Sequence, residues 1–112
     1  MDEMQVDRLV VAAIAPLGLP LWKGVCLEDI LPDCYLVYDS DGDTPELYEG
    51  DRDIGYSFSR RVHLYIKNWL DPKDIPKIIR KQLRQFGFTI SGPAYEIPAK
   101  EGYTHIVVSA YI

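Results

Sequence analysis

The sequence has few of the residues that build metal and redox sites. It contains two cysteines, Cys26 and Cys34, and two histidines, His63 and His105, in 112 residues. The cysteines make no C-x-x-C motif, and two cysteines cannot define a disulfide framework. We therefore expect reduced thiols in a cytosolic compartment, with a Cys26–Cys34 bridge as the alternative. The histidines lie in predicted strands and could meet on one sheet face, but their spacing indicates no metal site.

Long apolar runs and catalytic motifs are also missing. No apolar run reaches transmembrane length, and the opening Met1-Asp2-Glu3 is acidic where a signal peptide would be basic. The sequence contains no glycine-rich phosphate loop and no G-x-S-x-G motif. We therefore expect neither a membrane segment nor an enzyme, and no cofactor.

Basic charge is in deficit. The chain has 12 Lys and Arg against 17 Asp and Glu, and the resulting net charge of −5 argues against general nucleic-acid binding. The charges are also separated along the chain. Residues 39–53 carry seven acidic residues and one basic one, whereas residues 60–84 carry eight basic and two acidic ones. This separation favours either an intramolecular pairing or a head-to-tail contact between copies of the chain.

The acidic segment contains a partial calcium motif. Asp39, Asp41 and Asp43 occupy positions 1, 3 and 5 of an EF-hand-like loop, but Thr44 stands where this loop needs glycine. Gly50 stands where it needs a bidentate glutamate, and a strand precedes it instead of a helix. We therefore expect a solvated acidic turn, with these three aspartates as the weak calcium candidate.

The composition is that of one ordinary globular domain spanning residues 1–112, with 47% hydrophobic and 26% charged residues. Apolar periodicity predicts a first helix over residues 2–15, ended by Pro16. Its back is apolar as well, which predicts that a neighbouring molecule covers it. The inward stripe is Val6, Leu9, Val10, Ala13 and Ile14, and the apolar back is Val11, Ala12 and Ala15.

A second helix is predicted near residues 73–86, beginning near Ile75 because Pro76 fits only a first turn. Asp71 is the expected N-cap, and Gly87 is the expected stop. The predicted inward stripe is Ile75, Ile78, Ile79, Leu83 and Phe86. The opposite, basic face is Lys73, Lys77, Arg80, Lys81 and Arg84.

Strand patterns occur at residues 21–22, 35–38, 56–67, 88–90, 94–97 and 103–112. The predicted fold class is α+β, with a mostly antiparallel sheet packed by the two helices. Tyrosine is abundant, with eight residues, and several occupy outward strand positions. Because tyrosine is enriched at protein interfaces and the chain is acidic, we favour a protein contact over base stacking. These outward tyrosines are Tyr56, Tyr65, Tyr103 and Tyr111.

The order of these features resembles the tail-terminator, or tail-completion, proteins of long-tailed bacteriophages and prophages. The likeness runs from about Val6 to Ile112, and the chain departs from the pattern in its acidic loop and at residues 23–34. It rests on LPL at 19–21, YLVY at 35–38, VHLYI at 62–66, QFGF at 85–88, YE at 95–96 and YTH at 103–105.

The resemblance implies a structural virion protein. Such proteins form a ring, typically a hexamer, on the last ring of the tail tube. They stop tube polymerisation and give the head connector, or neck protein, a docking surface. The implied partners are further copies of this chain, the tail tube protein and the connector, with DNA only in transit through the lumen. The implied location is the virion tail or neck, and the host cytoplasm during assembly.

A ring requires two different complementary surfaces on each copy. We therefore predict a subunit contact between the acidic residues and the basic helix face, with the apolar back of the first helix also covered. A lumen position for the acidic loop is the rival placement. The predicted acidic interface residues are Asp39, Asp41, Asp43, Glu46 and Glu49.

Three alternatives remain open. The closest is another phage neck protein, a head–tail stopper or adaptor, which would share the ring logic. A small nucleic-acid-binding module would use the basic helix and show steep salt dependence. A calcium-dependent domain would use the three aspartates of the acidic loop.

Overall fold

The computed structural model describes residues 2–40, 58–97 and 102–112. They form two α-helices and a six-stranded sheet in the order β1-β2-β3-β6-β4, with β5 also paired to β6. β1 runs parallel to β2, and the other pairs are antiparallel. The predicted α+β class is therefore confirmed. The elements are α1 (Glu3–Ile14), the 3₁₀ turn η1 (Ala15–Leu17), β1 (Leu21–Lys23), β2 (Cys34–Ser40), β3 (Ser59–Lys67), α2 (Ile75–Gln85), β4 (Thr89–Ile90), β5 (Tyr95–Ile97) and β6 (Tyr103–Tyr111).

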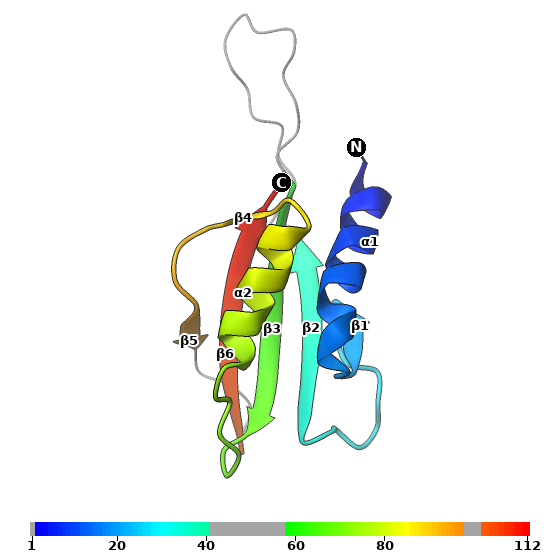
Figure 1. Ribbon diagram of the computed structural model, residues 1–112. Helices are drawn as coiled ribbons and strands as arrows, with labels where there is room; N and C mark the ends of the chain where they lie inside the picture. Colours follow the sequence, from blue (N-terminus) through cyan, green and yellow to red (C-terminus); the bar gives the residue numbers. More distant parts are fainter. Residues whose placement is uncertain (1, 41–57, 98–101) are drawn as a thin grey trace, which may run out of the picture.

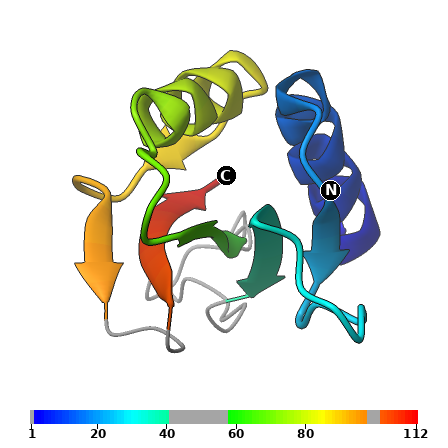
Figure 2. The same ribbon diagram turned by 90° about the horizontal axis from the view of Figure 1, so that it is seen from below.

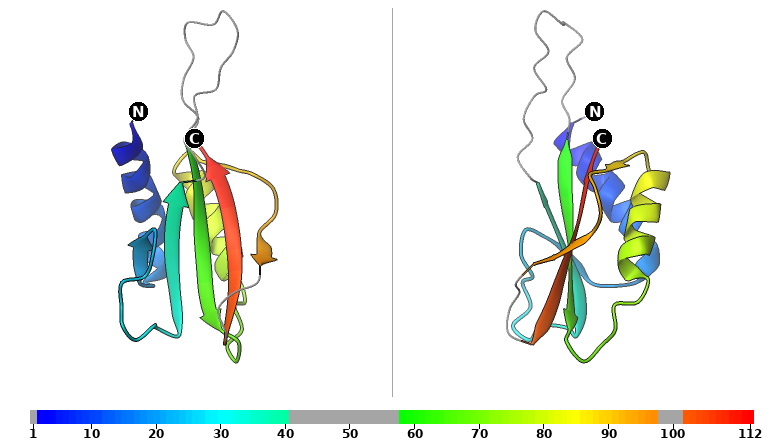
Figure 3. Two further views of the ribbon diagram at one scale, coloured as in Figure 1. Left: turned by 180° about the vertical axis from the view of Figure 1, so that it is seen from behind. Right: turned by 90° about the vertical axis from the view of Figure 1, so that its left-hand side faces the viewer.

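Both helices lie side by side on one face of the sheet (Figures 1 and 3). α1 lies toward β1 and β2, and α2 lies toward β6 and β4. The two helices therefore present their outer sides toward opposite edges of the sheet (Figure 2).

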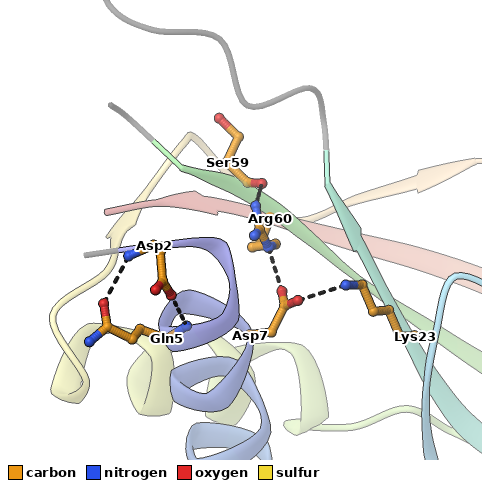
Figure 4. Close-up of polar contacts among 6 residues, drawn as sticks. All are labelled: Asp2, Gln5, Asp7, Lys23, Ser59 and Arg60. Atoms are coloured by element: carbon orange, nitrogen blue, oxygen red, sulfur yellow. Dashed lines mark hydrogen bonds and ion pairs between the residues drawn. The ribbon is translucent and has the colours of Figure 1, made fainter. Parts of the chain in front are cut away.

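The N-terminus of α1 is closed by a capping box. The Gln5 backbone N–H donates to the Asp2 carboxylate, and the Asp2 N–H donates to the Gln5 side chain, both at 2.8 Å (Figure 4). Two of the N–H groups that a helix start leaves unpaired are thus satisfied. The helix ends at Ile14, and Pro16 lies in the following 3₁₀ turn, as predicted.

α2 begins at Ile75 with Pro76 in its first turn, as predicted, but Asp71 is not its N-cap. The Asp71 carboxylate instead accepts from the Lys73 N–H at 2.9 Å, in the turn before the helix. Gly87 ends the helix with φ +96°. Its N–H donates to Arg84 O, and the Phe88 N–H donates to Leu83 O, both at 3.0 Å. This pair of bonds is a Schellman motif, which requires the left-handed conformation that glycine adopts without strain.

The main core lies between the helices and the sheet. Val6, Val10, Ala13 and Ile14 of α1 are buried there, as predicted. The strands predicted over residues 56–67 and 103–112 correspond to β3 and β6, whose side chains alternate between the two faces of the sheet. Two predictions about exposure are wrong: Tyr103 is buried, and Ile78 of the predicted inward stripe is exposed. The sheet residues facing the helices are Leu36, Tyr38, Val62, Leu64, Val108 and Ala110.

Candidate subunit interface

The outer side of α1 exposes apolar residues, as the sequence predicted. Val11, Ala12 and Ala15 are exposed and line a groove of about 340 Å³. Met4 and Tyr38, which the sequence did not single out, complete its apolar lining. The side chains of Asp7 and Arg8 add charge to it. The groove opens between α1 and β2.

Asp7 fixes this side of α1 to the sheet. Its carboxylate bonds Lys23 Nζ of β1 at 2.7 Å and Arg60 Nε of β3 at 2.8 Å (Figure 4). The Asp7 carboxylate also raises the pKa of Lys23. Arg60 is buried and donates to Ser59 O at 2.8 Å as well. A buried guanidinium must be paired in this way, so the ion pair holds α1 in register and gives the groove a fixed shape.

Three of the five residues of the predicted basic face are exposed on α2, and a fourth, Lys73, is exposed in the turn before the helix. Lys73, Lys77, Lys81 and Arg84 are exposed, whereas Arg80 is half-buried. None of the five makes an ion pair with any residue in 2–40, 58–97 or 102–112. The exposed apolar side chain of Ile78 lies on the same helix, and Trp69 is exposed in the turn that follows β3. The face is therefore mixed, basic and apolar.

Asp39, one of the predicted interface residues, is paired within its own chain. It lies in β2, and its carboxylate accepts from Arg61 Nε at 2.9 Å and lies 3.1 Å from His63 Nε2. The other predicted acidic residues, Asp41, Asp43, Glu46 and Glu49, lie outside the described residues, as does Tyr56. Within the described residues, no group of three or more His, Cys, Asp and Glu is placed to hold a metal ion.

The two histidines meet on the sheet face that lies away from the helices, as the sequence allowed. His63 Nδ1 and His105 Nε2 are 2.7 Å apart, and both rings are buried. The pKa of His105 is lowered to about 4, first by burial and then by His63, while Asp39 opposes the shift. Assigning the His63 ring proton to Nε2, where it donates to Asp39, makes His63 Nδ1 the acceptor of the His105 Nε2–H.

Aromatic rings stack against the hydrogen-bonded group formed by Asp39, His63 and His105. The Tyr65 ring lies 4.1 Å from that of His105 and 4.9 Å from that of Tyr35, in stacked geometry. Tyr103 approaches Tyr35 edge-on, and burial raises the pKa of Tyr35 to about 12. The facing ring nitrogens of His63 and His105 are hydrogen-bonded to each other. The cluster therefore fixes the arrangement of side chains on this face of the sheet.

In the described part of the chain, no helix is both long enough and apolar enough to span a membrane. A scan against protein-family models finds no match for this chain. A search of curated proteins likewise finds no significant match.

Proposed function

We propose that this chain is a structural subunit that assembles into a ring at the end of a phage tail tube, stops tube polymerisation and joins the tail to the head connector. The proposal starts from the resemblance in the order of the sequence motifs. The single observation that best supports self-assembly is the exposed apolar side of α1, where Val11, Ala12 and Ala15 line a groove. A second copy of the chain is its proposed occupant.

The arrangement of charge supports a copy-to-copy contact. The α1 groove and the basic face of α2 are different surfaces on different helices, and these helices lie toward opposite edges of the sheet (Figure 2). Contacts between two different surfaces are heterologous, and such contacts close into rings when the rotation between copies permits. The net charge of −5 leaves each copy with an excess of acidic groups to place against the basic face of a neighbour.

The test of self-assembly is native mass spectrometry of the purified protein at low and moderate salt, with electron micrographs of the same samples. We expect a closed ring, near six copies, that salt weakens. Val11→Asp should lower ring formation at least tenfold because it places a charge in an apolar contact, whereas Val11→Ala should retain the ring. Unfolding curves of both variants check that the subunit still folds. A monomer under every condition would contradict the proposal.

Tube termination needs a separate measurement. Tail tube protein polymerised with the ring should give tubes that stop growing and carry a cap at one end in micrographs. Rings that bind no tube end, but bind a connector, would favour the related stopper or adaptor role.

A further inference from the structure

The segment at residues 24–33, between β1 and β2, is held firmly from within. Its ends are tied by backbone bonds, from the Gly24 N–H to Tyr38 O at 2.9 Å and from the Lys67 N–H to Asp33 O at 2.8 Å. Tyr103 Oη donates to Pro32 O at 2.7 Å. Cys26 and Leu31 pack against the buried Tyr35, Val37 and Tyr103.

The same segment directs its other apolar side chains away from the protein. Val25, Leu27 and Ile30 are 58%, 77% and 88% exposed. Exposed acidic residues lie between and beside them, at Glu28, Asp29 and Asp33. Apolar side chains displayed on an anchored segment mark an interaction surface, because little conformational freedom is lost when a partner binds.

The outer face of α2 has the complementary chemistry. Lys77, Lys81 and Arg84 are exposed, and Ile78 of the same helix is 39% exposed. Both surfaces combine exposed apolar side chains with charged ones, and the charges are opposite, acidic on residues 24–33 and basic on α2.

Within one copy, residues 24–33 and α2 lie apart. Seen from below, residues 24–33 lie beside β1 and β2 on the side away from the helices, whereas α2 lies diagonally across the molecule (Figure 2). The view along the sheet edge likewise separates them on opposite faces (Figure 3). Complementary surfaces at opposite corners of one subunit suit a head-to-tail contact between subunits.

We propose that residues 24–33 of one copy dock on the outer face of α2 of the next copy. Leu27 and Ile30 pack on Ile78, and Glu28 and Asp29 pair with Lys77 and Lys81. The inference rests on the proposed ring and adds a second contact between copies to the one proposed at the α1 groove. It places the acidic partner of α2 in residues 24–33, where the sequence pointed to residues 39–53.

A charge swap tests the pairing. Glu28→Lys with Asp29→Lys, and separately Lys77→Glu with Lys81→Glu, should each reduce assembly at least tenfold in native mass spectrometry at low salt. All four substitutions in one chain should restore it, because the attraction is re-formed with reversed signs. All four substituted positions are exposed, so folding should persist, and unfolding curves check this. Failure of the fourfold variant to recover assembly would contradict the proposed pairing.

Cysteine cross-linking tests the geometry independently. In a Cys26→Ser, Cys34→Ser background, one copy carries Leu27→Cys and a second carries Lys81→Cys. We expect a disulfide-linked dimer when the two are mixed and little when either is oxidised alone. A dimer from the Leu27→Cys copy alone would instead indicate a symmetric contact and overturn the inference.

The two experiments separate the inference from the proposed function. Rings that form but show neither charge-swap rescue nor the mixed cross-link would retain the ring and overturn this contact. A chain that never associates, even when concentrated, would overturn both. Basic-face variants that lose DNA binding while their rings are unchanged would also overturn the contact and point to a nucleic-acid surface.

Discussion

The two faces of the sheet are buried by different means. Toward the helices, aliphatic side chains such as Leu64 and Val108 pack against α1 and α2, and Leu64 is 1% exposed. On the opposite face, His105 is 6% exposed, yet it is surrounded by Tyr65 and His63, with Asp39 beyond. Similar burial is therefore reached with aliphatic packing on one face and with hydrogen-bonded and stacked rings on the other.

The two faces differ in the conditions that make their burial stabilising. An aliphatic core gains stability in proportion to the area it removes from water and requires no directional partner. A buried ring nitrogen is destabilising unless it has a hydrogen-bond partner. The stability of the polar face therefore depends on the strand register that brings the partners together and on the protonation of the buried rings. We therefore expect the helix-covered face to dominate stability and the opposite face to dominate its pH dependence.

The largest expected loss of stability comes from a substitution on the helix-covered face. Leu64→Ala should lower the free energy of unfolding by about 3 kcal/mol, because it removes buried methyl groups and leaves a cavity. Its neighbour Tyr65 is only partly buried on the other face, and Tyr65→Leu should cost about 1 kcal/mol through loss of the ring stack. Urea unfolding at pH 7.5 measures both. Equal losses would contradict the comparison.

The next effect in size is the pH dependence from His105. Its pKa in the folded protein is about 4, against an ordinary value of 6.5, so the folded state binds fewer protons than the unfolded state between these values. The stability contribution of neutral His105 is therefore complete above pH 6.5 and is lost as the pH falls toward 4. We expect a loss of about 1–2 kcal/mol by pH 5.

His105→Gln provides the control for this pH effect. It removes the titrating ring but retains hydrogen-bonding groups, so it should flatten the fall in urea midpoint between pH 7.5 and pH 5. The Leu64→Ala variant should show the same fall in urea midpoint with pH as the wild type. If the variant lacking His105 also shows the full fall, other groups cause the pH dependence.

The sequence was sufficient for features that depend on neighbouring residues. The alternation of Val62, Leu64 and Ile66 assigned one face of β3, because side chains of a strand point alternately to its two sides. Gly87 marked the end of α2 because the local turn requires positive φ. Val11, Ala12 and Ala15 were recognised as an exposed apolar surface because helical periodicity placed them opposite the core stripe.

Features that depend on register or on competing partners were not predictable. His63 and His105 are 42 positions apart, and only the pairing of β3 with β6 brings their rings together. Asp39 was grouped with an acidic loop, because no local pattern shows that Arg61 lies opposite it. The segment at 24–33 has apolar residues without a helical or strand period, so its anchored inner side and exposed outer side required the structure.

The smallest expected effect compares one ion pair on each face. On the helix side, Asp7–Arg60 has side-chain exposures of 15% and 3%, whereas on the opposite face Asp39–Arg61 has 30% and 34%. Water and salt screen the second pair more, so its coupling energy should be about 0.5 kcal/mol, below that of Asp7–Arg60.

Double-mutant cycles with Asp39→Asn and Arg61→Gln, and with Asp7→Asn and Arg60→Gln, measure both couplings from urea unfolding. Raising the salt concentration should reduce the Asp39–Arg61 coupling proportionally more. A larger coupling for Asp39–Arg61 would mean that its bond to His63 strengthens the pair beyond what exposure allows, and the polar face would then contribute more to stability than its partial exposure indicates.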